Sequence, residues 1–456
     1  MWIVWTTISR MWSPHGDASV KRPQLLARCR AGAVGLGNTV AAVLVMAAST
    51  IMPCHAATLR VPSEYERLAV ACGAAESGDT VLVAAGTYSG VDTYSGTIFG
   101  KSLCVFVEGD GPAVFDREGG GADFLVVEGD ADHQVHIDGF ELRGGNTVFG
   151  ALIVAGGVSV TISNCTFYGI VAGEVAAVRV VDSARLTMMG CEFTSNQCQD
   201  DTIVSLESSR TATISDCRFS RNRDTTISCV GSGGAEFYDS TFLNDPGSRF
   251  ATSVAVGSPV TMERCVFGGA MSGVSVSSWA PLEMRACTVA GSRLGEAVTI
   301  FSSNATIENS VFAGNCGSDI AVRQGTLVLA CTSVDSVSVE SGTVTYGEGM
   351  VFGESQLCDV PSCEEPWRLG DYRLVAGTVA ASCPPCGFIY GAYEETCPGG
   401  GTGACCVGGE CLDLSSECCA WNGGVYGGDG VPCTPELCDQ PIPIRRSTWG
   451  AIKARW

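Results

Sequence analysis

The sequence is poor in charge and contains almost no histidine. Only 16% of its 456 residues are charged, and 27 Lys and Arg face 48 Asp and Glu, for a formal net charge of −21. Phosphate binding needs a basic surface, so we expect no nucleic-acid partner. Of the 4 histidines, only His133 and His136 follow residue 56. This scarcity argues against histidine-based acid–base chemistry along the chain.

A helical period is missing from most of the chain. Short β-branched runs joined by Gly and Ser fill it, whereas a leucine-rich or helical repeat would show apolar residues at a 3.6-residue spacing. The repeating part is therefore predicted to be all strand. What the chain has in abundance is Gly, with 58 residues, and Cys, with 25.

One six-residue pattern recurs along the chain, as in Ile162–Phe167 and Met188–Phe193. It begins with an apolar residue, has Cys, Ser or Phe in fourth place and usually ends in Phe. The fourth place falls at residues 140, 165, 191, 217, 240, 265, 287 and 310, so the steps are 25, 26, 26, 23, 25, 22 and 23 residues. A period in the twenties is typical of a solenoid.

The third place of the pattern predicts a bend. Gly, Asn and Asp predominate there, and these residues tolerate the left-handed backbone conformation. We expect a one-residue left-handed bend between two strands at Gly139, Asn164, Gly190, Asp216, Asp239, Arg264, Ala286 and Asn309.

Stacking of these copies predicts interior columns of identical residues. Parallel strands in register place Cys or Ser on Cys or Ser, and Phe on Phe. Buried free Cys behaves as a small hydrophobe, so the cysteine column needs no disulfide. On the outside, Glu192 and Arg218 lie one period apart and should be neighbours.

At this point the chain resembles the right-handed parallel β-helix, the fold of the pectin-lyase-like superfamily. Cys191–Asn196 and Cys217–Asn222 are similar to repeats of bacterial surface β-helix proteins. Gly78–Tyr88 resembles the first-coil signature of secreted members, in which Val81 and Val83 begin the core and the last residues leave the strand. The resemblance implies an all-β solenoid spanning residues 57–346.

Both ends of this solenoid need covering. Ser63 and Glu66 have the spacing of a capping box before Leu68–Gly73, which predicts a short helical cap at the amino-terminal end. Residues 347–397 break the period and resemble the closing segment of secreted β-helix proteins. Because an open solenoid end is an unpaired strand edge, we expect this segment to cover the other end.

The first 56 residues predict export. Basic residues between Lys21 and Arg30 precede an uncharged stretch, 31–53, that ends in a small-residue cleavage signal near Ala56. The same stretch is long enough to be a membrane anchor, which is the alternative. We expect a secreted or cell-surface protein whose mature chain has no transmembrane domain.

Twelve cysteines crowd into Cys358–Cys438, and eleven others lie in the solenoid span. That density in an exported chain predicts disulfides, with zinc bound at Cys383 and Cys386 as the alternative. Residues 398–440 form a small disulfide-rich module with seven cysteines, so one must pair outside it or stay free. The default for the tail, 441–456, is a solvated segment.

The resemblance raises the possibility of a polysaccharide lyase that acts by pectate-lyase-like β-elimination on uronic-acid polymers. One patch combines arginines with carboxylates on adjacent predicted coils, and an ordinary polar loop pair is the alternative for it. The candidate catalytic residues are Asp200, Asp201, Arg218, Arg221 and Asp224.

An acidic stretch between residues 108 and 132 suits calcium, because oxygen-rich flexible loops are the ligands that Ca²⁺ prefers. The candidate ligands are Asp110, Asp116, Asp123 and Asp130, and a solvated acidic face is the alternative. No cofactor is expected to be required, and Ca²⁺ is the one metal that the sequence favours.

The absence of a complete catalytic motif favours a non-catalytic scaffold, monomeric and secreted, that binds a polysaccharide or a cell-surface glycan. Exposed aromatic residues would support sugar stacking, and the candidates are Tyr168, Trp279, Tyr346 and Trp367. A basic residue beside clustered carboxylates in a cleft would favour the lyase, whereas a flat face lined by Ser, Thr and Gly would favour the binder.

Overall fold

The computed structural model describes residues 57–90, 96–117, 123–147, 150–243, 252–269, 272–277, 279–293, 295–353, 357–359, 371–376, 378, 386, 390–392, 396, 401–407, 410–421, 424–434 and 438. The predicted export signal, 1–56, and the tail, 441–456, lie outside these residues. So does Trp367.

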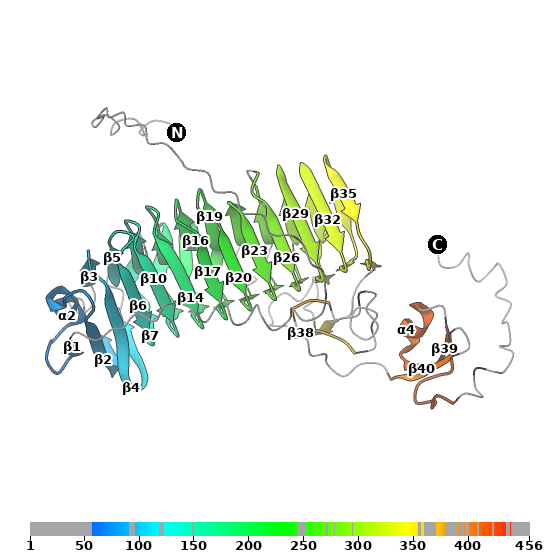
Figure 1. The fold of residues 1–456 in the computed structure, drawn as a ribbon, viewed down its shortest axis with the longest axis horizontal. Coiled ribbons are helices and arrows are strands. Elements are labelled where there is room, and N and C mark those ends of the chain that lie inside the picture. Colours follow the sequence, from blue (N-terminus) through cyan, green and yellow to red (C-terminus); the bar gives the residue numbers. More distant parts are fainter. Residues whose placement is uncertain are drawn as a thin grey trace, which may run out of the picture. The chain divides into compact units, whose positions relative to one another are not determined.

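Most described strands belong to two parallel sheets of one solenoid (Figure 1). The 23-stranded sheet contains β1 (Thr58–Val61), β2 (Thr80–Ser89), β4 (Leu103–Asp116), β6 (Gln134–Asp138), β7 (Phe140–Arg143), β10 (Ser159–Ser163), β11 (Thr166–Tyr168), β14 (Arg185–Met189), β15 (Glu192–Thr194), β17 (Ala212–Ser215), β18 (Arg218–Ser220), β20 (Ala235–Tyr238), β21 (Thr241–Leu243), β23 (Val260–Glu263), β24 (Val266–Gly268), β26 (Leu282–Arg285), β27 (Thr288–Ala290), β29 (Ser303–Glu308), β30 (Val311–Ala313), β32 (Gly325–Ala330), β33 (Ser333–Val334), β35 (Thr343–Tyr346) and β36 (Val351–Phe352). The 13-stranded sheet contains β3 (Gly96–Phe99), β5 (Leu125–Glu128), β8 (Asn146–Thr147), β9 (Leu152–Ala155), β12 (Val171–Ala172), β13 (Val175–Val180), β16 (Gln197–Glu207), β19 (Arg223–Val230), β22 (Thr252–Gly257), β25 (Ser272–Val276), β28 (Val298–Ile300), β31 (Ile320–Val322) and β34 (Val337–Val339).

All eight predicted bends are confirmed. Their φ angles lie between 49° and 85°, and Cys331, with φ 49°, continues the row by one more coil. A second left-handed bend follows five residues later in most coils, at Gly144, Gly169, Ser195, Arg221, Gly269, Gly291 and Gly314. Sequence reasoning missed this second row. The two bends enclose a short strand in each coil, which explains why one sheet takes two strands per coil and the other usually one.

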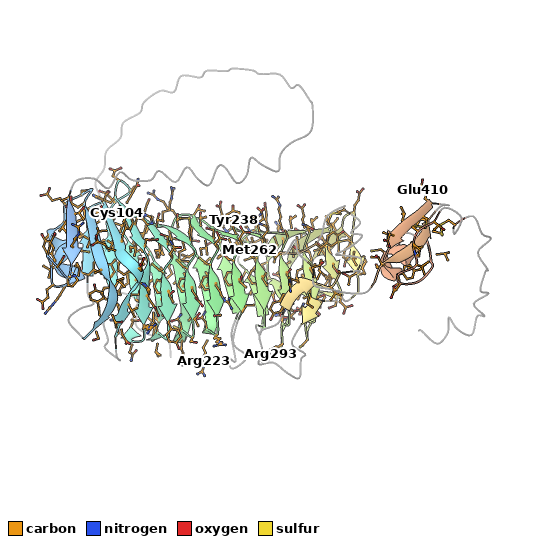
Figure 2. The ribbon with its side chains drawn as sticks, turned by 90° about the horizontal axis from the view of Figure 1, so that it is seen from below. Cys104, Arg223, Tyr238, Met262, Arg293 and Glu410 are labelled. Atoms are coloured by element: carbon orange, nitrogen blue, oxygen red, sulfur yellow. A yellow bond between two sulfur atoms is a disulfide. The ribbon has the colours of Figure 1, made fainter. Side chains whose placement is uncertain are left out.

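The predicted phenylalanine column forms the centre of the core. Phe167, Phe193, Phe219, Phe242 and Phe267 are buried and stack face to face, with ring centroids 4.6–4.8 Å apart. The in-register pairing that produces this stack also places Glu192 beside Arg218, as expected. Figure 2 shows the contrast between Met262, buried inside the coils, and Arg223, which points outward.

Cysteine and asparagine columns continue this interior. Cys165, Cys191, Cys217, Cys265 and Cys287 are buried free thiols, as predicted. Cys104, Cys316 and Cys331, which lie in the same span, are instead disulfide-bonded. At the second bend, asparagine side chains supply hydrogen bonds to backbone groups of the preceding coil. Buried Asn196 accepts a hydrogen bond from the Ile170 amide (3.0 Å) and donates one to the Phe167 carbonyl (2.9 Å).

The amino-terminal end carries the predicted helix with a different cap. Helix α2 (Leu68–Ala74) contributes Leu68, Ala71 and Cys72 to the core. Arg67 occupies the N-cap position without a side-chain hydrogen bond, so the predicted capping box is wrong. The other helix end is held by Lys101, whose Nζ donates to the carbonyls of Cys72 (3.0 Å) and Ala75 (2.7 Å). Val81 and Val83 are core residues as predicted, but β2 continues through Tyr88 to Ser89.

The segment that follows the solenoid lies on the outer face of the coils. Parallel pairing continues to β36, beyond the expected boundary at residue 346. The described part of 347–397 then packs against the outer face of the last coils. Much of the predicted closing segment lies outside the described residues. A second cluster of buried apolar residues forms there, outside the main core, and includes residues of strands β37 (Leu357–Asp359) and β38 (Asp371–Leu374). Its members are Leu243, Val266, Ala290, Val311, Ala313, Val351, Leu357, Tyr372, Leu374 and Tyr390.

Specific contacts hold this segment, which we call the strap (residues 357–392). Cys386 forms a disulfide with Cys331, and the Tyr390 hydroxyl donates to the Gly349 carbonyl at 2.7 Å. A side chain at Gly268 would collide with the ring of Tyr372. The terminal strands remain exposed, since Val339 of β34 and Tyr346 of β35 are 47% and 48% accessible. The strap packs on the outer face because the outward side chains of the second strand in each late coil are apolar.

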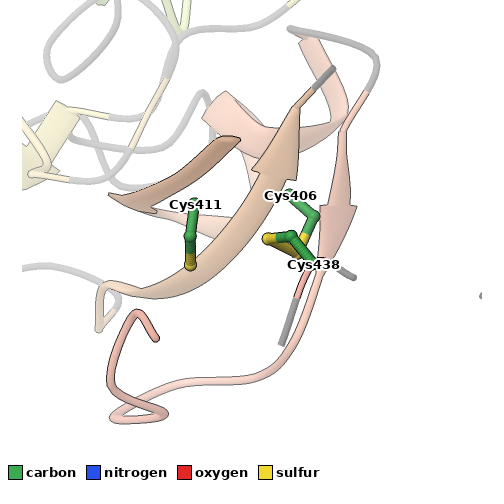
Figure 3. A group of neighbouring side chains, drawn as sticks. All are labelled: Cys406, Cys411 and Cys438. Carbon is green, nitrogen blue, oxygen red and sulfur yellow. A yellow bond between two sulfur atoms is a disulfide. The ribbon is translucent and has the colours of Figure 1, made fainter. Parts of the chain in front are cut away.

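The cysteine-rich module contains β39 (Gly403–Val407), β40 (Glu410–Leu414), α4 (Ser416–Trp421) and β41 (Val425–Tyr426). Cys405 pairs with Cys419, Cys406 with Cys438, and Cys411 with Cys433. Cys418 is also disulfide-bonded, so its partner lies outside this group of seven. Cys406, Cys411 and Cys438 bring their sulfur atoms together (Figure 3), but all three are in disulfides and offer no thiolate to zinc.

Among the described helices, none combines the length and the apolar character that crossing a membrane requires.

Candidate functional site

The outer face of the 13-stranded sheet carries a column of outward positions that is set by register. Its described side chains are mainly small: Val126, Ile153, Arg179, Ser205, Ser228, Ser275, Thr299, Ala321 and Ser338. Ser205 and Ala321 are nevertheless buried. Ser228, Ser275, Thr299 and Ser338 present accessible hydroxyl groups on this column, whereas the buried Ser205 donates to Glu207 Oε1 at 2.7 Å. Accessible hydroxyl groups are part of the arrangement that sequence reasoning associated with a binder.

Arg179 interrupts that column. Its guanidinium lies 3.6 Å from a Glu174 carboxylate oxygen and 3.3 Å from one of Glu207. It lines an open depression of about 460 Å³ together with Ile153, Val181, Asp182, Glu207 and Ser208. A basic residue beside two carboxylates is the arrangement that sequence reasoning associated with a lyase, but at residues it did not name.

The opposite end of the sheet carries a second arginine of this kind. Arg323 lies 2.9 Å from a Glu296 oxygen and 3.3 Å from a Glu340 oxygen. Phe301 lies one residue beyond the register pair Ile300 and Val322, next to Arg323 on the neighbouring coil. Trp279 lies on the coil before Phe301, where its amide donates to the Ser302 carbonyl at 2.8 Å. Of the proposed stacking aromatics, Trp279 is 81% exposed, Tyr346 48% and Tyr168 47%.

The predicted lyase patch is distributed over both sheets. Arg218 lies exposed in β18 of the 23-stranded sheet, and Arg221 forms the bend after it. Asp200 and Asp201 lie in β16 and Asp224 in β19, both strands of the 13-stranded sheet, and their side chains are outside the described set. The segments do lie on adjacent coils. Asp200 and Asp201 fall where the β16 and β19 register shifts, between Gln197 and Thr202.

The predicted calcium ligands are also dispersed. Asp110 is exposed in β4, Asp116 ends that strand beside Arg143, and Asp130 lies 2.8 Å from the Nδ1 of His133. Burial raises the pKa of Asp123, while the charge of Arg117 acts in the opposite direction. Within the described residues, these four do not gather three ligand atoms within 4.8 Å. The prediction of a calcium site at these residues gains no support from this geometry.

One hydrogen-bonded chain of polar side chains was not foreseen. His136 Nε2 lies 2.9 Å from Ser163 Oγ, and that hydroxyl donates to Asp138 Oδ1 at 2.6 Å. Burial lowers the pKa of His136, with Asp138 opposing the shift. The serine stands between the histidine and the aspartate, so its proton points to the carboxylate and not to a histidine base. This order differs from a serine nucleophile that is activated by histidine.

Two of the buried thiols, Cys72 and Cys229, are unsuited to nucleophilic chemistry. Burial raises the pKa of Cys72 and that of Cys229 to about 12. The thiolate is the nucleophile and the metal ligand, so these cysteines remain inert core residues at neutral pH.

The arginine depression and the Trp279 turn depend on spacing that the repeat pattern does not predict. The six-residue pattern lies in the 23-stranded sheet, where the two bends of a coil, wherever both are described, are five residues apart. Glu174 and Arg179 lie in the more variable part of each coil. The sequence did contain a hint that Arg179 and Glu207 are neighbours, because they are 28 residues apart, close to one period. Whether their side chains meet depends on the length of the turn between them.

The comparisons agree with the fold. Residues 150–312 match the family model described as a right-handed β-helix region. With the parallel stack, this confirms the predicted hand and fold class. No curated protein matches the chain.

Several solved structures are similar at low identity. The pectate lyase Pel9A has 13% identity and a TM-score of 0.42, over 72% of this chain and 91% of that one. The A-module of the mannuronan C-5 epimerase AlgE6 from Azotobacter vinelandii has 12% identity and a TM-score of 0.34, over 63% and 94%. The surface adhesin PfbA of Streptococcus pneumoniae has 9% identity and a TM-score of 0.22, over 67% and 93%.

Proposed function

We propose that this right-handed parallel β-helix protein is an exported, non-catalytic scaffold that binds glycans on the outer face of its 13-stranded sheet. The observation that carries the proposal is the set of accessible hydroxyl groups of Ser228, Ser275, Thr299 and Ser338, with the exposed Trp279 and Phe301 on two of the same coils. Hydroxyl groups on a rigid surface can exchange hydrogen bonds with sugar hydroxyls without reorganising. The disulfides support export, because such bonds persist in oxidising compartments.

The arginines of this face are already paired, which weighs against a lyase even though an arginine beside carboxylates is the arrangement expected of one. Arg179 and Arg323 each contact two carboxylates. A guanidinium whose charge is already compensated has little left to neutralise a substrate carboxylate in a transition state. Such arginines fix the surface and limit its attraction for polyanions.

The test is retention of the purified protein on an array of plant, microbial and animal glycans. We expect saturable retention on a small set of related structures, and isothermal titration should reproduce it with the soluble oligosaccharide. Retention on no glycan, in the presence or absence of Ca²⁺, would contradict the proposal.

A lyase acting at the Arg179 depression is the second candidate, supported by the arginine between Glu174 and Glu207. Incubation with uronic-acid polysaccharides and Ca²⁺ should produce no ultraviolet-absorbing unsaturated product if the scaffold proposal holds. A rise that Arg179→Ala abolishes would instead establish a lyase at the depression. A rise lost in Arg218→Ala or Arg221→Ala would place it at the patch around β18.

A further inference from the structure

Trp279 is the most unusual exposed residue of the solenoid. It lies in the turn between β25 and β26, and its side chain is 81% exposed. Its φ angle is 66°, in the left-handed region that bulky residues rarely adopt. Burial of the indole therefore contributes little to stability, and the backbone at Trp279 is strained.

The same turn in other coils shows what the fold itself requires. Left-handed residues there include Ser208, Gly231 and Ser302, with φ between 50° and 63°. Small residues meet the backbone requirement at lower cost. A tryptophan in this turn contributes nothing that the coil needs, and backbone strain that packing does not explain is a mark of functional positions.

The two coils that follow Trp279 carry further exposed aromatic and polar side chains on the same edge of the solenoid. Phe301 is 49% exposed on the next coil. Ser302 Oγ donates to Gln324 Oε1 at 2.5 Å, and Thr326 Oγ1 donates to Asn304 Oδ1 at 2.6 Å, both at exposed positions. Aromatic faces with adjacent amides and hydroxyls offer an apolar platform together with hydrogen-bond partners, the composition found in sites for polar small molecules.

The charges around this turn favour an uncharged glycan over an acidic one. Arg323, which follows the register partner of Ile300, is paired with both Glu296 and Glu340. Arg285 of β26 is paired with Glu283 and Glu308. The chain as a whole has a formal net charge of −21, which repels polyanions. A ligand that stacks here meets hydroxyl and amide groups, and the described arginines Arg285 and Arg323 are each paired with two carboxylates.

We propose that Trp279, Phe301 and the polar pairs Ser302–Gln324 and Asn304–Thr326 form a binding site for an uncharged polysaccharide, with a sugar ring stacked on the indole. This inference rests on the proposed glycan-binding function and names its ligand class and its site. The strain at Trp279 persists because binding depends on the ring.

Affinity electrophoresis in gels containing a β-glucan, a galactomannan or polygalacturonate tests the site. We expect retardation by an uncharged polymer and none by polygalacturonate. Trp279→Gly should lower the affinity at least about tenfold, since the platform is lost. The same variant should keep or raise the thermal midpoint, because glycine relieves the left-handed strain. The control Phe352→Ala removes an aromatic side chain that is 62% exposed in β36 of the 23-stranded sheet, away from the proposed binding face, and should bind as the wild type does.

The outcomes separate this inference from the broader proposal. Retardation by polygalacturonate alone, or equal retardation of Trp279→Gly and wild type, would overturn the Trp279 site and leave glycan binding standing. Failure of both uncharged polymers to retard the wild type would also overturn it, and the glycan array then decides whether the scaffold binds glycans at all. A lowered thermal midpoint in Trp279→Gly would show that the indole serves the fold.

Discussion

Replacing Phe193 by alanine is expected to lower the free energy of unfolding by about 3–5 kcal/mol, the cost of truncating a fully buried aromatic side chain. The Phe193 ring is buried and stacks between Phe167 and Phe219, at centroid distances of 4.7 Å and 4.6 Å. Its loss leaves a cavity bounded by two rings that in-register strands hold in place, so the site cannot collapse. Urea denaturation followed by circular dichroism measures the change.

The matched control is Phe99→Ala, the same truncation at a side chain that is 65% exposed. It should change the free energy of unfolding by less than about 0.5 kcal/mol, as surface substitutions usually do. Similar losses for the two variants would contradict a core built on the phenylalanine column.

Removing the strap disulfide with Cys331→Ser and Cys386→Ser is expected to have the second large effect. The bond closes a loop of 55 residues, for which chain entropy predicts a loss of about 4 kcal/mol. Without it, the strap should detach more readily from the apolar outer face that includes Val266 and Val311. Thermal unfolding and limited proteolysis of residues 357–392 measure both consequences.

Cys287→Ser controls for the change of sulfur to oxygen. Cys287 is a free thiol, fully buried, in a column that holds Ser310 on the next coil and Ser240 two coils earlier. Those serines donate to carbonyls two residues earlier, at 2.8 Å and 2.9 Å, and the hydroxyl that this substitution introduces would find the equivalent carbonyl of Arg285. We expect a small effect. If the double variant were as stable as Cys287→Ser, the disulfide would not be what holds the strap.

The candidate site shows where sequence reasoning stopped. Trp279 could be named from sequence as an exposed aromatic candidate, but neither its left-handed backbone nor its position beside Phe301 follows from the residues. The arginine depression was missed because Arg179 meets Glu207 only if the turn between the two sheets has the right length. Asp200 and Arg218 were placed correctly on adjacent coils, yet they lie in different sheets, and the bend at Arg221 likewise separates Arg218 from Asp224.

The sequence by itself determined the coil: its period, its first row of left-handed bends, and its columns of Phe and Cys. These follow from local conformation and from translation by one period, which repeats any favourable contact along the whole stack. Only the tertiary structure decided where the strap lies, which cysteines are bridged and which outward side chains meet. Those outcomes depend on contacts between segments of unlike sequence, such as Tyr372 on Gly268 and Cys386 on Cys331. No periodicity encodes such pairs, because each forms once and its partners are chosen by the shape and apolar character of a surface that exists only after the coils have stacked.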